Sequence, residues 1–206
     1  MTDPAGNPLP DQNPASPRAT TPPPAPATPT GWARIARRIR VPLGFLFAIV
    51  YFYLAHPTWR TIIAGLVLAT PGVLIRALAS GHIHKNEQLT TTGPYAYTRN
   101  PLYLGSFIIA LGFAVASRSL WVAAVMVVLF LAIYLPVIRS EEAYLRHRFS
   151  KFEDYARNVP RILPRLRAHQ PHGAFSWQQY LKHREYNAAL GTLAMMAGLA
   201  AKLLVR

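Results

Sequence analysis

Residues 101–138 read PLYLGSFIIALGFAVASRSLWVAAVMVVLFLAIYLPVI and are the most apolar part of the chain. It contains two apolar runs, Pro101–Ser117 and Leu120–Ile138, and neither run carries a charged residue. Each run has the length, roughly 17–25 residues, that a helix needs to cross the hydrocarbon of a membrane. Only Arg118 and Ser119 separate the two runs. The stretch therefore predicts a tight antiparallel hairpin of two membrane helices.

Three further apolar runs lie outside the hairpin. Val41–Ala55 is short, although the basic segment before it can extend its helix, and Thr61–Ala79 is interrupted only by Arg76 near its end. Asn187–Leu204 is rich in Ala, Gly and Met, so it either crosses the membrane or lies on the membrane or the protein surface. No Gly-rich loop follows a strand, which argues against a Rossmann-type domain. We expect an all-α membrane bundle of four to five transmembrane helices.

The distribution of basic residues predicts the orientation of these helices. If the N-terminus is cytoplasmic and each run crosses once, 17 Lys and Arg residues fall on the cytoplasmic side and four on the other side. Basic residues favour the cytoplasmic side of a membrane. We therefore expect an integral membrane protein with a cytoplasmic N-terminus, in the inner membrane if the host is bacterial.

The overall composition has to be interpreted segment by segment. The 206 residues carry a formal net charge of +14, which by itself suggests a nucleic-acid partner. Membrane orientation and anionic lipid headgroups account for that charge, so we expect membrane lipids and no nucleic acid as partners. The chain has no cysteine, which excludes a disulfide scaffold, a thiolate metal site and a cysteine nucleophile.

The chain divides into three parts. Residues 1–31 hold ten of the 19 prolines and almost no bulky aliphatic residue, so they are predicted to be a disordered tail. Residues 32–166 form the predicted membrane domain, which contains the cytoplasmic polar motifs. Residues 167–206 contain a polar, aromatic segment and the last apolar run. That segment is either an interfacial anchor or an element that closes over a substrate.

Two polar motifs meet at the cytoplasmic end of the hairpin. The first, Thr90–Tyr103, runs directly into a helix beginning at Pro101, and it is either a site for an anionic group or an interfacial aromatic belt. The second, Glu141 and Glu142, forms either a solvated ion-pair network or hydrogen bonds to a ligand. The hairpin brings both motifs together, which suits a zwitterionic, nucleotide-like ligand. Gly105 and Gly112 lie on one helix face and serve either close packing or a flat ligand.

These motifs resemble those of a known family. The pattern Gly93-Pro94-Tyr95-x-x-x-Arg99-Asn100-Pro101-x-Tyr103-x-Gly105, followed by Glu141-Glu142, is similar to that of the integral-membrane isoprenylcysteine carboxyl methyltransferases and the related phospholipid methyltransferases. The segment from Phe149 to Pro160, followed by Leu163-Pro164, resembles the family's aromatic helix and closing loop. The resemblance covers about residues 60–166.

The resemblance implies S-adenosylmethionine as methyl donor, bound at the cytoplasmic mouth of the hairpin. The residues that it implies for donor binding are Glu87, Gln88, Leu89, Thr90, Gly93, Tyr95, Asn100, Pro101, Leu102, Tyr103 and Glu142. The residues that it implies for catalysis are Arg99, Arg139, Glu141 and Glu142. Three departures from the family are Asn100 in place of a frequent His, Ser150 in place of Gly, and the position of Arg139, slightly downstream of the family's substrate arginine.

The implied reaction is methyl transfer to a lipid-like acceptor that enters sideways from the bilayer. The resemblance points first to an O-methyltransferase of the isoprenylcysteine carboxyl methyltransferase type, with an isoprenoid or phenolic lipid as acceptor. A phospholipid N-methyltransferase and a non-enzymatic membrane protein that retains the fold stay open. A carboxylate acceptor needs no base, whereas an amine or a phenol must lose a proton, and Glu141 and Glu142 are the nearby acids.

Overall fold

The fold is described by a computed structural model that covers residues 31–83, 88–169 and 173–205. Of the predicted disordered tail, residues 1–30 lie outside the described residues, and Gly31 begins the first helix. Within these ranges the chain is helical and contains no strand, which confirms the all-α prediction. The elements are α1 Gly31–Leu54, α2 Trp59–His82, η1 Gly93–Ala96, α3 Pro101–Ser117, α4 Leu120–Leu129, η2 Phe130–Tyr134, α5 Leu135–Arg148, α6 Phe152–Asn158, α7 Trp177–Lys182 and α8 Tyr186–Leu204.

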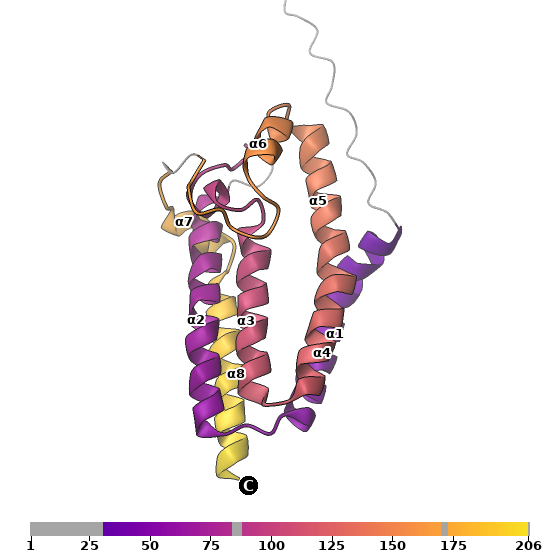
Figure 1. The fold of residues 1–206 in the computed structure, drawn as a ribbon, viewed down its shortest axis with the longest axis vertical. Coiled ribbons are helices and arrows are strands. Elements are labelled where there is room, and N and C mark those ends of the chain that lie inside the picture. The colour runs from indigo at the N-terminus through magenta and orange to yellow at the C-terminus, as the bar shows by residue number, and fades with distance from the viewer. Residues whose placement is uncertain (1–30, 84–87, 170–172, 206) are drawn as a thin grey trace, which may run out of the picture.

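The long helices form two groups that run nearly parallel to one axis (Figure 1). Helices α2, α3 and α8 lie side by side, and the continuous helix α4–η2–α5 lies with α1 (Figure 1). Three helices of the described part are long and apolar enough to cross a membrane, namely α2, residues 120–148 and α8, and shorter apolar helices are α3 and Gly44–Leu54. The last apolar run thus forms a helix, α8, that is long enough to cross a membrane and lies beside α2.

Glycines hold α2 against α3. A Cβ atom added to Gly72 of α2 would lie 2.6 Å from the carbonyl oxygen of Gly105 on α3, and Gly65 and Gly112 make a similar contact. Small residues allow two membrane helices to bring their backbones into contact. The face that carries Gly105 and Gly112 is therefore filled by α2, which confirms the packing interpretation and leaves no room there for a flat ligand.

The hairpin between α3 and α4 is tight at its turn and opens toward the other end (Figure 1). Arg118 adopts a left-handed conformation with φ 50°, and the Ser119 side chain accepts a hydrogen bond from the backbone of Val122. The predicted fourth helix is also not regular, because η2 is a π-helical turn. In a regular α-helix the ring of Pro136 would clash with the carbonyl oxygen of Ala132, and the wider turn avoids that clash.

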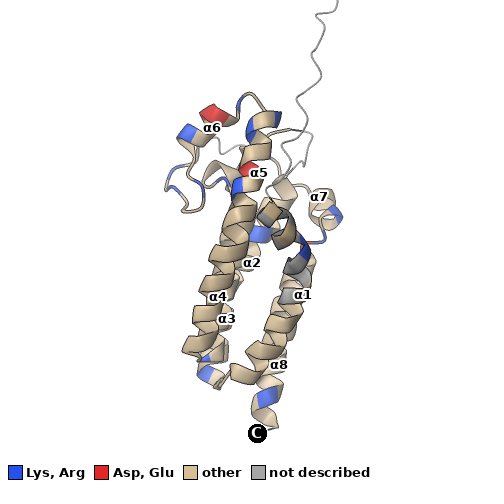
Figure 2. Ribbon diagram, turned by 90° about the vertical axis from the view of Figure 1, so that its right-hand side faces the viewer, with Lys and Arg blue, Asp and Glu red and all other residues tan. Residues whose placement is uncertain are grey.

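Charged residues gather at the end of the bundle that carries α6 and α7 (Figure 2). At the opposite end, Lys202 on α8 donates a hydrogen bond from Nζ to the carbonyl oxygen of Ala55, 2.7 Å away, and a second one to Phe52. These carbonyl groups end α1, so a lysine satisfies the open end of that helix. The uneven charge agrees with the orientation expected from the sequence, which stays a prediction.

The contact between α2 and α3 predicts that alanine substitution has different effects on stability at two glycines. Gly72→Ala places a methyl group against the backbone of α3 and should lower the free energy of unfolding by about 2 kcal/mol. Gly191→Ala on α8 has nothing within 4 Å and should leave stability unchanged or raise it, because alanine favours a helix. Thermal unfolding in detergent micelles measures both variants. Equal stability of the two would contradict this account of the helix contact.

Candidate functional site

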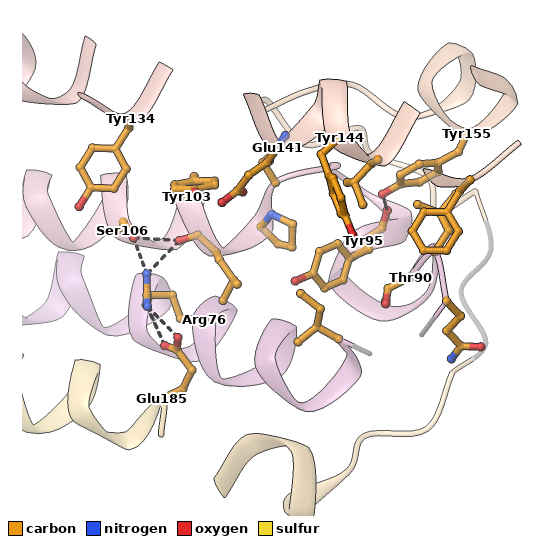
Figure 3. Close-up of a pocket in the computed structure, with 18 residues that line it drawn as sticks. Arg76, Thr90, Tyr95, Tyr103, Ser106, Tyr134, Glu141, Tyr144, Tyr155 and Glu185 are labelled. Atoms are coloured by element: carbon orange, nitrogen blue, oxygen red, sulfur yellow. Dashed lines mark hydrogen bonds and ion pairs between the residues drawn. The ribbon is translucent and has the colours of Figure 1, made fainter. Parts of the chain in front are cut away.

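A cavity of about 690 Å³ lies at the charged end of the bundle, between the start of α3 and helix α5 (Figure 3). The loop before η1, helix α6, the end of α2 and the start of α8 complete its wall. The lining residues are Arg76, Ile83, Gln88, Leu89, Thr90, Tyr95, Asn100, Pro101, Leu102, Tyr103, Ser106, Tyr134, Glu141, Tyr144, Leu145, Phe149, Tyr155 and Glu185.

Most residues expected to bind the donor line this cavity. They are Gln88, Leu89, Thr90, Tyr95, Asn100, Pro101, Leu102 and Tyr103. Glu87 lies outside the described residues. Gly93 is not among the lining residues. Its backbone lies close to the ring of His82 and has a positive φ of 58°. Glycine adopts this conformation without strain, so Gly93 shapes the turn that carries Tyr95.

Tyr95 brings an unpartnered hydroxyl group to the cavity. Its side chain is 7% exposed, and its hydroxyl points into the cavity without a hydrogen-bond partner in the described structure (Figure 3). Its backbone carbonyl accepts a hydrogen bond of 2.7 Å from the Tyr155 hydroxyl, which fixes the loop. Burial, and then Tyr155, Glu141 and Glu185, raise the pKa of the Tyr95 hydroxyl above its ordinary value. The group therefore stays protonated at neutral pH and can donate to a bound ligand.

Glu142 is the centre of a buried ion-pair network and does not line the cavity. It is 3% exposed, and its carboxylate lies 2.9 Å from Nε of Arg161 and 3.2 Å from Nδ2 of Asn100. Nε of Arg99 also lies 3.2 Å from this carboxylate, although without hydrogen-bond geometry. The prediction that Glu142 lies close to Arg99–Tyr103 is confirmed, and the solvated version of the network is wrong because Glu142 is buried.

The remaining predicted catalytic residues lie in different places. Arg99 is not a lining residue, and it donates from Nη1 to the carbonyl oxygen of Ala156, 3.1 Å away. Arg139 is exposed on α5 and is not a lining residue. Glu141 does line the cavity. The geometry therefore makes Glu141 the member of the predicted set that a ligand could contact, while Arg99 and Glu142 support the wall.

The segment after α6, residues 159–169, packs across the first motif and is called the strap below. It follows the loop between η1 and α3 and forms backbone and side-chain hydrogen bonds to it. These bonds join Arg99 to Pro160 at 2.9 Å, Arg165 to Tyr97 at 3.0 Å, His169 to Ala96 at 3.1 Å and Thr98 to Ile162 at 2.9 Å. Arg161 on the same strap binds Glu142. These bonds hold the closing loop that the resemblance implies against the first motif.

An ion pair that the sequence analysis did not assign to the site forms the other end of the cavity. Arg76 on α2 donates from Nη2 to both oxygens of Glu185, at 2.9 Å and 2.7 Å, and from Nε to one of them at 3.1 Å (Figure 3). Its Nη1 donates to Ser106 and to the carbonyl oxygen of Leu102. The sequence did contain a signal for this pair. Arg76 is a charged residue inside an apolar run, and such a charge needs a partner.

Unlike the Arg76–Glu185 pair, Glu141 has no ion-pair partner within the described chain. Within the described chain, its carboxylate makes no hydrogen bond or ion pair with another residue, whereas Arg76 and Glu185 neutralise one another. Tyr144 lies three residues further on the same face of α5. Tyr103 packs against the cluster of Ile133 and Val137, which lies one to two turns before Glu141. Glu141 thus presents a charge to the cavity among aromatic rings (Figure 3).

A second, apolar groove of about 160 Å³ adjoins the cavity. It shares Ser106 and Tyr134 with the cavity and lies between α1, α3, α4 and η2. Its other lining residues are Gly44, Phe47, Ala110, Met126, Leu129, Phe130 and Ile133. The polar cavity therefore has an apolar groove beside it, lined by residues of the membrane helices.

Comparisons with known proteins support a family assignment. A profile of the phospholipid methyltransferase (PEMT) family matches residues 77–152. The cobalt-zinc-cadmium resistance protein CzcN of Cupriavidus metallidurans is 33% identical over 159 residues, which cover 73% of this chain and 72% of that protein. The protein-S-isoprenylcysteine O-methyltransferase of Schizosaccharomyces pombe is 27% identical over 139 residues, covering 65% of this chain and 58% of that protein.

Another relative matches a smaller part of the chain. The nickel-cobalt-cadmium resistance protein NccN of Alcaligenes xylosoxydans xylosoxydans is 42% identical over 103 residues, which is 50% of this chain. The chain spans about half of that relative's length, 47%. No solved structure matches the chain significantly. The family match and the apolar helices together identify an integral membrane protein.

The Arg76–Glu185 pair predicts a difference between single and double substitutions. Glu185→Ala leaves a guanidinium that is 23% exposed without its counter-charge and should cost about 3 kcal/mol of stability. The double variant Arg76→Met with Glu185→Leu replaces the pair by apolar groups of similar volume and should recover most of that loss. Unfolding in detergent measures both.

Glu153→Ala is the matched control. Its pair with Arg146 is about half exposed, so it should change stability by no more than about 1 kcal/mol. If Glu185→Ala were as mild as this control, the pair would not have the energetic role that its burial indicates.

Proposed function

Since the chain belongs to the phospholipid methyltransferase family, we propose that it transfers a methyl group from S-adenosylmethionine to a lipid-like acceptor. The observation that carries the proposal is the cavity of about 690 Å³ whose wall includes eight residues that the family resemblance implies for the donor. The distant similarity to an isoprenylcysteine O-methyltransferase supports the same reaction class. Residues 167–206, which lie beyond the family match, contribute Glu185 to the wall.

The residues present fit such a donor. S-adenosylmethionine supplies a methyl group that is reactive because it is attached to a positively charged sulfur atom. The protonated hydroxyl of Tyr95 and the side chains of Gln88, Thr90 and Asn100 offer hydrogen bonds on the cavity wall. Tyrosine rings offer stacking surfaces, and the carboxylate of Glu141 offers a charge opposite to that of the sulfonium. The enzyme's own part is to orient the two reactants and exclude water.

The apolar groove supports a lipid-like acceptor. Because it shares Ser106 and Tyr134 with the cavity, an acceptor tail in the groove would place the head of the acceptor inside the cavity. Such an acceptor would enter from the bilayer, while the donor would enter from the aqueous side. In this proposal the N-terminus and the cavity are cytoplasmic, and the membrane is the inner membrane if the host is bacterial.

One observation favours an accepting group that carries a proton over a carboxylate. A carboxylate acceptor would need a cation to bind it, and Arg76 is the basic residue among the described lining side chains. Its donors are already used by Glu185, Ser106 and Leu102. An amine or hydroxyl acceptor needs a base instead, and Glu141 lies in the cavity to accept that proton. A phospholipid-type N-methyltransferase or a hydroxyl methyltransferase thus fits better than carboxyl methylation.

Binding of labelled S-adenosylmethionine to the purified, detergent-solubilised protein tests the proposal. The wild-type protein should bind it saturably, and Tyr95→Phe should weaken binding by about three- to tenfold, the effect of losing one hydrogen bond. Tyr53→Phe is the matched control, because Tyr53 is 83% exposed on α1 and far from the cavity lining. Absence of saturable binding would overturn the proposal.

The acceptor is sought in lipid extracts of cells with and without the protein. The proposal expects a lipid whose mass differs by one methyl group between the two extracts. A hydroxyl or amine at the methylated position would support Glu141 as the base. Methylation of a carboxylate would instead overturn that assignment of the accepting group.

A further inference from the structure

The strap carries a group of exposed apolar and basic side chains. Leu163 is 78% exposed, and Leu166 is fully exposed, at 100%. Arg165 and Arg167 lie on either side of Leu166 and are exposed as well. Residues 159–169 contain no acidic residue. A single exposed leucine is ordinary on a protein surface, but leucines interspersed with arginines and free of acids are typical of segments that bind a membrane surface.

Two of the arginines keep their charge available. Arg161 is already paired with Glu142, whereas neither Arg165 nor Arg167 forms an ion pair with a carboxylate of the described chain. Arg165 does donate a hydrogen bond to the carbonyl oxygen of Asn158, but that group is neutral and leaves the positive charge uncompensated. The strap thus presents two cations to whatever lies outside it.

The backbone of the strap is held in place, so these side chains form a fixed surface. The backbone N–H groups of Arg165 and His169 donate to the first motif at 3.0 Å and 3.1 Å. The hydroxyl group of Thr98, on that motif, donates to the carbonyl oxygen of Ile162 at 2.9 Å. The exposure of the leucines is therefore not that of a loose turn. A ligand that binds this surface has little backbone left to order, which favours binding.

The strap lies at the level where a membrane surface meets the bundle. Helix α2 begins at Trp59, and roughly 20 residues of helix cross the hydrocarbon, so the other boundary falls near Ser80. The 3-10 helix η1, to which the strap is bonded, packs against this end of α2. Helix α7 begins here too, since the backbone N–H of Ser176 donates to the carbonyl oxygen of Gly81 at 2.9 Å. Its Trp177 is 70% exposed, as is typical of a membrane–water interface.

The strap also projects sideways from the bundle, beside α6, where its arginines are blue (Figure 2). A bilayer that surrounds the helices therefore lies directly next to it. Anionic headgroups attract arginine, and the apolar layer beneath them accepts leucine side chains. Free phosphate would satisfy the arginines but not the leucines. The combination of the two residue types favours a lipid surface.

We propose that the strap is a contact for anionic lipid, in which two arginines bind headgroup phosphates while two leucines enter the edge of the hydrocarbon. The arginines are Arg165 and Arg167, and the leucines are Leu163 and Leu166. This inference goes beyond the proposed function and does not depend on it. The lipid surface supports from outside the same segment that holds Glu142 through Arg161.

The test uses fluorescent probes at single cysteines, because the chain has no cysteine of its own. The full chain with Leu166→Cys is labelled with bimane and placed in nanodiscs of phosphatidylcholine, with or without phosphatidylglycerol. Iodide quenches a probe in water, and a nitroxide attached near the lipid headgroup quenches a probe in the membrane surface. In the anionic discs, the nitroxide should quench this probe and iodide should not. Asp154→Cys on α6 is the matched control, since Asp154 is exposed outside the strap, and iodide should quench it in both discs.

A second substitution tests the charge. In the Leu166→Cys protein, Arg167→Gln should lower the ratio of lipid-contacting to water-exposed probe about fivefold in anionic discs, the effect of one arginine near an anionic surface. Arg157→Gln is the matched control, because Arg157 is exposed on α6, and it should leave the ratio unchanged.

Three results would overturn the inference. The first is equal quenching by iodide at Leu166→Cys and Asp154→Cys in both discs. The second is protection from iodide without quenching by the nitroxide, because a protein surface would then cover the strap. The third is nitroxide quenching that depends neither on phosphatidylglycerol nor on Arg167. None of these results bears on binding of a methyl donor, so the proposed function is tested separately.

Discussion

The close approach of α2 and α3 is the constraint on which the rest of the structure depends. Where Gly72 meets Gly105, the two backbones come into contact, which larger side chains would prevent. Gly105 also leaves room for the aliphatic part of Arg76, since a Cβ atom there would lie 2.6 Å from Cγ of the arginine. Arg76 can therefore extend along α3 and contact both Ser106 on that helix and Glu185 at the start of α8. The glycine contact thus sets both the helix pair and one end of the cavity.

The cavity exists because the second half of the hairpin does not follow the first. Helix α3 stays with α2, whereas α4, η2 and α5 diverge from it beyond the turn (Figure 1). At the wide end, the network around Glu142 bridges α5 to Asn100 at the start of α3 and to Arg161 on the strap. Desolvating this carboxylate is costly, and several partners are needed to offset the cost. The network accordingly fixes the separation of the two helices while leaving the space between them open.

Much of this arrangement could be predicted from the sequence. Charge-free runs and the two-residue connection specify the helices and the hairpin turn, because hydrocarbon permits few alternatives. Eight of the residues that the family resemblance implies for the donor share the wall of one cavity, whereas their binding to a donor stays a prediction. What the sequence could not resolve was which of Glu141 and Glu142 faces the cavity. Adjacent residues on a helix point about 100° apart, and the phase depends on the π-helical turn upstream.

The pairing of Arg76 with Glu185 shows a different limit of sequence reasoning. The two residues are 109 positions apart, and Glu185 lies beyond the residues that resemble the family. Their contact depends on α8 packing beside α2, which no local pattern specifies. A half-buried arginine near the membrane is costly without a partner, so the pair links the C-terminal helix to the cavity wall. Because this pair also neutralises the arginine, the C-terminal segment determines the net charge that a ligand meets in the cavity. A part of the chain outside the matched family region therefore influences the electrostatics of the site itself.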